Sequence, residues 1–346
     1  MLIIGCDFHP GFQQVAIFDN QTGEIEQRRL RHREEAEQFY GGLVAGAWVG
    51  MEACGQYPWF ERLLQACGHQ LWLGDAGAIR ASVVRRQKTD RRDAEHMLDL
   101  LRQGRFPRIW VPSLEERDVR QLLVHRHKQV QARTRVKNQL QAMALSQGMQ
   151  KKWKLWSQAG RAELKKLELL PYAGQRREQL LASLDELEAE VAQLNRQVDE
   201  EVAKRAAAVR LMTHPGVGPV TALAMVLTLG PAERFASGKQ VASYFGLIPS
   251  EHSSGGGQRL GHISKQGNSF LRFLLVEAGQ SAARQDPELG RCYRRLSLRK
   301  HRGLAKVAVA RKLAVRLYLM LREDWTYAQL QKAVVQASPS HSVVTG

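Results

Sequence analysis

Residues 2–19 read LIIGCDFHPGFQQVAIFD, and this stretch decides the fold class. Its first apolar run is followed by Asp7, and its second run alternates in polarity until it reaches Asp19-Asn20, a turn signal. A third run of strand character comes next, so the three runs predict a meander. The predicted strands are Leu2–Cys6, Gln14–Phe18 and Glu24–Leu30.

Beyond this meander the chain alternates between helix and strand as far as residue 110. Helices are predicted at Arg33–Leu43, Pro58–Cys67 and Asp90–Gln103, and strands at Ala47–Met51 and Gln70–Leu73. Three strands followed by alternating helices and strands form an α/β pattern. The ribonuclease-H type of fold is built in this order, so residues 1–110 are predicted to be one domain of that type.

From residue 111 the sequence becomes almost wholly helical. Ser113 and Glu116 have the Ser-x-x-Glu spacing of a capping box, which predicts a helix from there to about Gly148. Its section from Arg120 to Lys137 has six basic side chains and no acid: Arg120, Arg126, Lys128, Arg133, Arg135 and Lys137. Such a stretch is typical either of a solvated helix face or of a surface that binds a nucleic-acid backbone.

A second long helix, predicted around residues 178–209, has the opposite charge. Residues 178–201 contain eight acids and one base, so this segment is expected to avoid phosphates and to pack on protein. Spacings of four and three alternate along its apolar seam, as in a coiled coil. The seam consists of Leu180, Leu184, Leu187, Val191, Leu194 and Val198. We expect this coiled coil to join copies of the chain into a dimer or tetramer.

Residues 210–330 are predicted to form a third, mainly helical unit, and residues 331–346 a disordered tail. Helices are predicted at Ser269–Arg284 and Gly303–Arg322. The residues between 250 and 322 include 15 lysines and arginines but only four acids, which gives this unit a second basic surface.

The segment His214-Pro215-Gly216-Val217-Gly218 predicts a tight turn between two helices. It resembles half of a helix-hairpin-helix, in which backbone N–H groups, here around Gly216 and Gly218, meet a DNA phosphate without reading the sequence. A helix connection that needs glycine only for packing is the alternative.

Composition limits the classes of function. Across 346 residues, 51 lysines and arginines against 34 acids give a net charge of +17, which indicates a polyanionic partner. The apolar stretch Val220–Leu229 has about half the length that spans a bilayer, so no membrane insertion is expected. We also expect no signal peptide, since no basic segment leads into an apolar one at the N-terminus. Four widely spaced cysteines favour a reducing cytoplasm.

Four acids have a defined place in the predicted fold. Asp7 and Glu52 each end a predicted strand, and Asp90 and Asp93 are three residues apart on a predicted helix, so both can face one edge of the sheet. Converging carboxylates raise one another's pKa unless a cation lies between them. Mg²⁺ takes such oxygen ligands, and two ions together can clamp the attacking and the leaving oxygen when a phosphodiester is cut. The acids therefore predict a magnesium site.

Each of these acids could instead be an ordinary solvated carboxylate at a strand end or a helix N-terminus. Asp75 and Asp99 are competing candidates for the same site. Asp99 lies six residues from Asp93, which places it on a different face of the helix.

A Ser-Ser-Gly-Gly-Gly segment begins at Ser253 and Ser254. Glycines allow close approach to a phosphate, and a serine hydroxyl becomes a nucleophile only with a base, a metal ion or nearby cations. Local side chains that could supply charge are His252, Arg259, His262 and Lys265. The same composition is also ordinary in flexible linkers.

Taken together, these motifs resemble the DEDD transposases of the IS110 insertion-sequence family, which includes the Piv-type invertases. The resemblance covers about residues 1–325 and rests on the segments Ile4–Asp7, Gly50–Gly55, Lys88–Ala94, His214–Gly218, Phe245–Pro249, Ser253–Gly256 and Ile263–Gly267. Pro10 stands where members of the family often have a basic residue.

The resemblance implies a RuvC-like domain in which Asp7, Glu52, Asp90 and Asp93 bind Mg²⁺, and a C-terminal transposase domain with a serine nucleophile. By spacing from Pro249 that serine is Ser254, with Ser253 as the fallback. The family further implies a recombinase in a bacterial host, guided to target and donor DNA by a non-coding bridge RNA. It also implies an oligomer in which the acids of one subunit meet the serine of another.

The alternatives are a RuvC-like metal-dependent junction nuclease in which the serine is incidental, a Piv-like DNA invertase, and a nucleic-acid-binding protein without catalysis. The basic residues 120–137 become a candidate surface for the RNA backbone.

Overall fold

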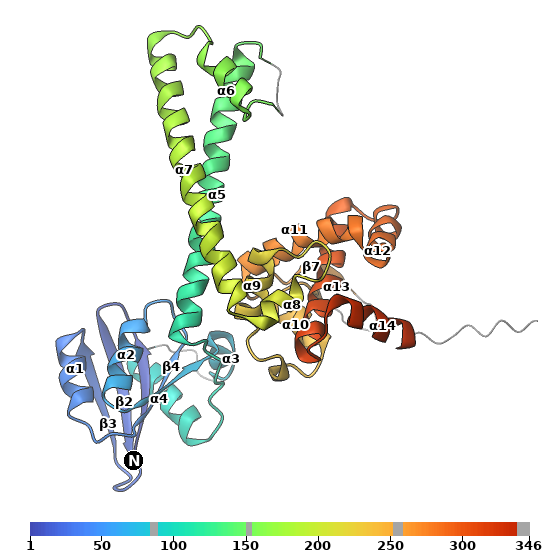
Figure 1. The fold of residues 1–346 in the computed structure, drawn as a ribbon. Coiled ribbons are helices and arrows are strands. Elements are labelled where there is room, and N and C mark those ends of the chain that lie inside the picture. Colours follow the sequence, from blue (N-terminus) through green and yellow to red (C-terminus); the bar gives the residue numbers. More distant parts are fainter. Residues whose placement is uncertain (84–88, 150–153, 252–258, 338–346) are drawn as a thin grey trace, which may run out of the picture. The chain divides into compact units, whose positions relative to one another are not determined.

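The computed structural model describes residues 1–83, 89–149, 154–251 and 259–337 (Figure 1). Its contacts divide the chain into two compact units, Met1–Val111 and Pro112–Gly346. No helix among the described residues is both long enough and apolar enough to cross a membrane.

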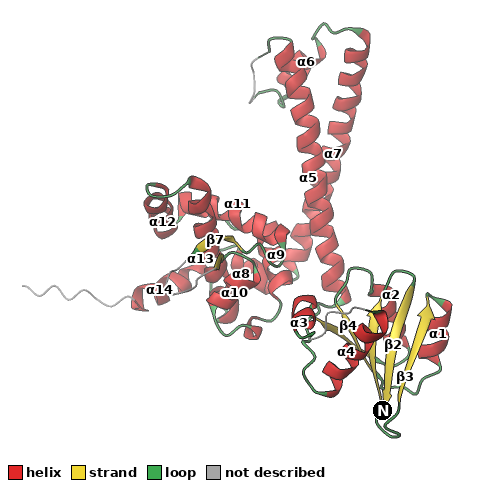
Figure 2. Ribbon diagram, turned by 180° about the vertical axis from the view of Figure 1, so that it is seen from behind, coloured by secondary structure: helices red, strands yellow, loops and turns green. Residues whose placement is uncertain are grey.

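The first unit is built on a five-stranded mixed sheet, drawn as yellow arrows in Figure 2. The strands are β1 (Leu2–Phe8), β2 (Phe12–Asp19), β3 (Ile25–Arg31), β4 (Trp48–Glu52) and β5 (Gln70–Gly74), in the order β3-β2-β1-β4-β5. The first three pair antiparallel, whereas β4 runs parallel to both β1 and β5. This is the predicted ribonuclease-H order, and the predicted α/β fold is confirmed.

Helices cover both faces of this sheet. One core forms against α1 (Glu34–Gly41) and α2 (Pro58–Ala66), and a second core on the other face forms against α3 (Ala76–Ala81) and α4 (Asp90–Arg102). The sequence did not predict α3, which has only six residues and is too short to show helical periodicity. Asp75 begins it, because its carboxylate accepts a hydrogen bond from the Ala78 N–H at 2.7 Å.

Two glycines bring α4 directly against the sheet. A Cβ on Gly5 would lie 2.2 Å from the Ala94 carbonyl oxygen, and a Cβ on Gly50 would lie 2.7 Å from a Leu101 methyl group. Gly5 of β1 and Gly50 of β4 are neighbours in register, so they form one flat strip beneath the helix. The absence of side chains on this strip allows α4 to pack closely against the sheet.

Gly5→Ala is expected to destabilise the protein by about 3 kcal/mol or more, because the new methyl group meets helix backbone that cannot move aside. Gly11→Ala is the matched control, since nothing lies within 4 Å of its Cβ position. Urea denaturation followed by tryptophan fluorescence measures the difference. Equal midpoints for the two variants would contradict the close packing of α4.

The second unit begins with a long helical hairpin. Ser113 and Glu116 form the predicted capping box at the start of α5 (Leu114–Ser146), and α7 (Pro171–Ala203) lies alongside α5 (Figure 2). The short helix α6 (Gln158–Lys165) lies between them in the chain. The predicted second helix thus begins earlier than expected and ends earlier, because α8 (Ala206–Leu211) follows as a separate element.

The apolar seam of α7 packs on α5 within the same chain. Leu181 and Leu184 bury against Leu140, while Val198 and Val202 join a core that includes Leu123. The prediction that this acidic helix packs on protein fits the arrangement, but the coiled coil expected between copies has its seam occupied by the chain's own α5. An intramolecular partner so close in sequence is easier to reach than a second chain.

The remaining elements are mainly helical. They are α9 (Pro219–Leu229), a short 3₁₀ turn (Ala232–Arg234), α10 (Gly238–Tyr244), β6 (Pro249–Glu251), β7 (Leu260–Ile263), α11 (Ser269–Gln285), α12 (Pro287–Ser297), α13 (Arg302–Arg322) and α14 (Tyr327–Ala337). The structure has no core boundary at residue 209, since residues of α5 and α7 share one core with residues 208–330.

The predicted tail is partly wrong, because α14 extends through residues 331–337. The side chain of Leu330 is buried and the Tyr327 hydroxyl donates a hydrogen bond to Asp286, so this helix is held by the body of the unit. Residues 338–346 lie outside the described residues.

Candidate active site

Asp7 and Glu52 lie side by side at the ends of two parallel strands. Cys6 pairs with Met51 in register, so the next residue of each strand is one of these acids. Each acid lies two residues beyond a glycine of the strip beneath α4, and side chains two apart point to the same face. Both carboxylates are therefore aimed at the face that α4 covers.

The other two predicted acids come from the first turn of α4. Asp90 is the first residue of the helix and Asp93 lies one turn further on. Thr89 caps this end, because its hydroxyl accepts a hydrogen bond from the Arg92 N–H at 3.4 Å. The Lys-Thr-Asp motif thus contains a helix start, which brings Asp90 to the sheet edge next to Asp7. Lys88 lies outside the described residues.

His9 joins this site, and sequence reasoning missed it. Its Nε2 lies 3.0 Å from an Asp7 oxygen and 3.6 Å from an Asp90 oxygen. The ring stacks on Phe12 at 4.6 Å, and the His9 N–H donates to the Phe12 carbonyl in the turn after β1. The sequence could have indicated His9, because it lies two residues after Asp7 and side chains two residues apart in an extended chain point to the same side.

The site can hold a cation. Asp7, His9 and Asp90 each offer one ligand atom, and these atoms all lie within 4.8 Å of one another. Burial raises the pKa of Asp7, contacts with His9 oppose this rise, and the charges of Asp93 and Asp90 add to it. A divalent cation would relieve this crowding of negative charge. Glu52 and Asp93 stand outside the 4.8 Å group but beside it in the fold.

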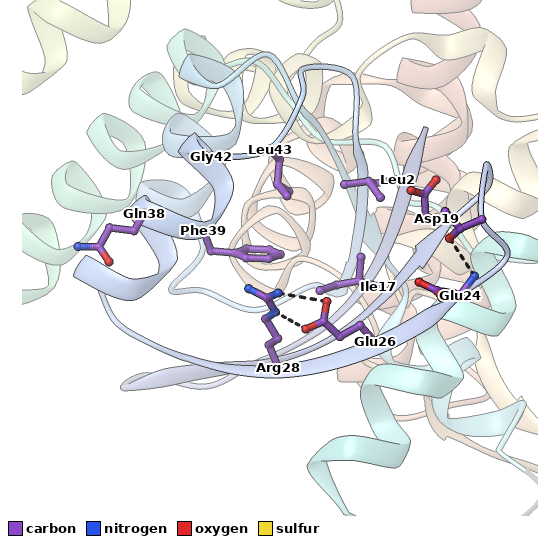
Figure 3. A pocket seen from close by; sticks show the side chains of 11 residues that line it. Leu2, Ile17, Asp19, Glu24, Glu26, Arg28, Gln38, Phe39, Gly42 and Leu43 are labelled. Carbon is purple, nitrogen blue, oxygen red and sulfur yellow. Dashed lines mark hydrogen bonds and ion pairs between the residues drawn. The ribbon is translucent and has the colours of Figure 1, made fainter.

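The first unit also contains a pocket that is lined by acids but is separate from the acid site (Figure 3). It encloses about 430 Å³ between α1 and the strands β1–β3, and Asp19, Glu24 and Glu26 are among its lining residues. Arg28 pairs with Glu26 at 2.6 Å. Leu2 also lines the hollow and lies at the opposite end of β1 from Asp7, so the hollow is separate from the acid site. Its acids would repel a phosphate.

In the second unit, the predicted serines fall outside the described residues. Ser253 and Ser254 are in the segment 252–258, which joins β6 to β7. The two strands pair antiparallel, and this hairpin was not predicted. Arg259 and Lys265 are both exposed next to it.

The two sequence motifs that flank this hairpin pack closely against each other. Gly246 and Gly267 both have positive φ, and a Cβ on either would approach the other segment's backbone within 2.3 Å. Arg272 donates to the Phe245 carbonyl at 3.0 Å and to the Gln266 carbonyl at 2.7 Å. The Phe-Gly-Leu-Ile-Pro and Ile-Ser-Lys-Gln-Gly segments therefore form one rigid frame from which the hairpin projects.

The His-Pro-Gly-Val-Gly turn contributes packing. A Cβ on Gly216 would lie 2.4 Å from the Ala282 nitrogen, so this glycine is explained by its contact with α11. His214 is buried and its ring meets the edge of Tyr327 at 4.6 Å; burial lowers its pKa to about 4. Gly218, the N-cap of α9, has open space around its Cβ position.

The basic stretch of α5 is divided between two roles. Arg126 donates to Asn195 at 2.8 Å, Lys137 pairs with Glu188 at 2.7 Å, and Arg120 donates to the Leu227 carbonyl. These three side chains are engaged within the protein. Lys128 and Arg135 are exposed and Arg133 is half-buried. One acid of α7, Glu188, thus neutralises a charge that the sequence assigned to nucleic acid, and two further basic side chains are occupied by neutral acceptors.

A ribonuclease-H-like sheet with acids at the ends of its central strands defines a DEDD-type, metal-dependent nuclease domain, here followed by a mainly helical region. Residues 4–148 match the family of DEDD transposases of the IS110 type, and residues 208–294 match the family described as "Transposase IS116/IS110/IS902 family". The chain belongs to this family of transposases, which are enzymes that bind DNA and move insertion sequences.

Several bacterial relatives match along most of the chain. A "Probable family 20 transposase" of Pseudomonas aeruginosa is 30% identical over 338 residues, which cover 94% of this chain and 98% of the relative. The "Transposase for insertion sequence element IS1111A" of Coxiella burnetii is 26% identical, with 94% and 91% covered. The "Transposase for insertion sequence element IS1328" of Yersinia enterocolitica is 29% identical, with 77% and 81% covered.

Proposed function

We propose that this transposase is a Mg²⁺-dependent recombinase that cuts and rejoins DNA through a serine nucleophile, Ser254, under the guidance of a bridge RNA. The observation that carries the proposal is the convergence of Asp7 with Asp90 and Asp93 in a ribonuclease-H-like fold, where burial raises the pKa of Asp7 and the charges of the two other acids add to the rise. The family match and the serine pair between β6 and β7 support the rest.

Asp7, Glu52, Asp90 and Asp93 would hold the metal, with His9 beside them. Bound Mg²⁺ would supply Lewis-acid polarisation of a phosphodiester oxygen. The Ser254 hydroxyl would lose its proton as its oxygen bonds to phosphorus, while the bond from phosphorus to one deoxyribose oxygen breaks and that oxygen takes up a proton. A DNA hydroxyl would later attack the same phosphorus and release the serine. The bond energy of the strand is thereby kept, so rejoining needs no further energy source.

Nucleic acid would be held by basic side chains outside the acid site. Arg259 and Lys265 are exposed beside the hairpin and would contact the DNA, and Gly218 is the remaining candidate of its turn for a phosphate contact. Lys128, Arg133 and Arg135 form the part of α5 still available for the RNA backbone. A homo-oligomer would be needed if acids and serine meet between chains, and it would use a surface other than the occupied seam of α7.

The test is recombination with and without the small RNA. Protein purified from cells that also express the flanking element is expected to carry a discrete small RNA and to exchange strands between donor and target DNA in Mg²⁺. Protein stripped of RNA by ribonuclease is expected to lose the exchange and to regain it when the RNA is restored. Full exchange by RNA-free protein would contradict guidance. Cleavage without rejoining would favour the junction nuclease.

A further inference from the structure

A groove in the second unit is lined by residues of the β6–β7 hairpin and of the helices α12 and α13. It encloses about 850 Å³, within the range of roughly 300–1,000 Å³ that ligand pockets span. The larger apolar residues of this hairpin groove are Leu247, Pro249, Ile263, Leu296, Leu304 and Val307. Leu304 is 54% exposed, so its side chain is accessible to a ligand in the groove.

The rest of the hairpin groove is basic. Among the described lining residues, the charged or titratable side chains are His262, Lys265, Lys300, His301 and Arg311, and none of these residues is an aspartate or a glutamate. The groove beside α14 differs, since it includes Asp286 and Glu288. A concave surface with an apolar floor and only basic side chains around it is complementary to a ligand that is flat and apolar in one part and anionic in another.

Two of the basic side chains are set in place by local backbone. Lys265 has φ 55°, an uncommon conformation outside glycine that the rigid frame of Gly246 and Gly267 enforces, and such positions cluster at functional sites. His301 caps α13, where its Nδ1 accepts from the Gly303 N–H at 3.1 Å. A neutral His301 ring therefore has its proton on Nε2, from which it can donate to an anion.

We propose that the hairpin groove binds one unpaired nucleotide of a DNA strand, with the base on the apolar floor and the flanking phosphates at the basic rim. The inference rests on the proposed function, since β6 and β7 are the strands that precede and follow the tandem serines in the chain. A duplex offers only phosphates to a concave surface and would leave the floor uncovered. An unpaired base has an apolar face that can cover it.

The experiment measures the affinity of the full-length protein for a fluorescent 20-nucleotide single-stranded DNA, its matched duplex, and an RNA of the same sequence. Leu304→Gln is expected to weaken single-stranded DNA binding about fivefold and to change duplex binding less than twofold. Leu298→Gln is the matched control, because Leu298 is 87% exposed and does not line the groove. Both substitutions are uncharged, so neither alters long-range attraction.

A second pair of variants tests the rim. Lys300→Gln and Arg311→Gln are each expected to reduce the slope of log affinity against log salt by about one for single-stranded DNA. Equal effects of Leu304→Gln and Leu298→Gln would overturn the proposal, and so would an equal loss of duplex binding. Tighter binding of the RNA, lost in Leu304→Gln, would overturn the assignment to DNA.

The proposal that the groove binds a nucleotide and the proposal that Ser254 is the nucleophile are tested by different variants, so one can be wrong while the other holds. Ser254→Ala is expected to bind the single-stranded DNA as the unchanged protein does, because a neutral hydroxyl contributes little to phosphate binding. If Ser254→Ala still forms a covalent adduct with DNA, the serine assignment fails, and the Leu304→Gln result still decides the groove.

Discussion

Asp7→Asn is expected to lower DNA cleavage and strand exchange by at least about 100-fold while leaving DNA affinity unchanged or slightly higher. Loss of a group that merely orients a metal ligand already costs roughly 10–100-fold, and Asp7 is proposed as a ligand itself. The amide has nearly the shape of the carboxylate and can still accept a hydrogen bond from His9, so the local contacts of β1 persist.

The same substitution, Asp7→Asn, is expected to keep or raise the stability of the folded protein although it lowers the activity. Burial disfavours the ionised form of Asp7, and Asp93 and Asp90 add repulsion, so the neutral amide removes an unfavourable charge from the fold. The melting temperature of Asp7→Asn without divalent metal is therefore expected to equal or exceed that of the unchanged protein. Lost activity in a protein that is no less stable is the signature of a functional site rather than a structural one.

Asp99→Asn provides the matched control for this experiment. Asp99 is exposed on the same helix as Asp90 and was a competing candidate from the sequence, but it faces away from the sheet. Its amide variant is expected to retain activity within about twofold. Activity retained by Asp7→Asn, or lost equally by Asp99→Asn, would refute the acid site as drawn.

The approach of Asp7 to Asp90 could be predicted because each acid follows a local signal: Asp7 ends an apolar run, and Thr89 begins the helix whose first residue is Asp90. Glu52 also ends an apolar run, but Glu52 and Asp93 lie outside the group that Asp7, His9 and Asp90 form, and their part in the site stays a prediction. Contacts that depend on a partner far away in the chain were missed. The pairing of α5 with α7 converts basic side chains such as Arg126 and Lys137 from candidate ligand contacts to internal ones, and only the fold reveals this.

The same limit explains the C-terminal misassignment. Residues 331–346 are largely small or polar, which predicts disorder, yet α14 is ordered through Ala337. Its anchor is a buried polar cluster in which Arg316 pairs with Asp286 at 2.8 Å and the Tyr327 hydroxyl donates to the same carboxylate. These residues are spread over about forty positions and show no pattern in the sequence. The β6–β7 hairpin was missed for a related reason, because its strands have only three and four residues.

Ser254→Ala is expected to abolish the covalent protein–DNA adduct and strand rejoining, whereas Ser253→Ala should retain most of both. The reason is chemical: alanine has no oxygen to bond to phosphorus, and attack by water instead would not conserve the bond energy of the cut strand. The measurement is denaturing gel electrophoresis of end-labelled DNA after rapid quenching, which detects the adduct directly. DNA affinity should be unchanged, since a neutral hydroxyl contributes little to phosphate binding.

Single and double variants of Ser253 and Ser254 show which serine, if either, is the nucleophile. An adduct that survives Ser254→Ala but not Ser253→Ala would move the nucleophile by one position. An adduct that survives the double variant would require a different nucleophile and contradict the serine mechanism. Strand cleavage at full rate by the double variant, with no adduct at all, would mean that the acids act on water, as in a junction nuclease. Asp7→Asn is expected to remove activity whether the attacking group is a serine or water. The acid variant therefore cannot distinguish these two mechanisms, whereas the serine variants can.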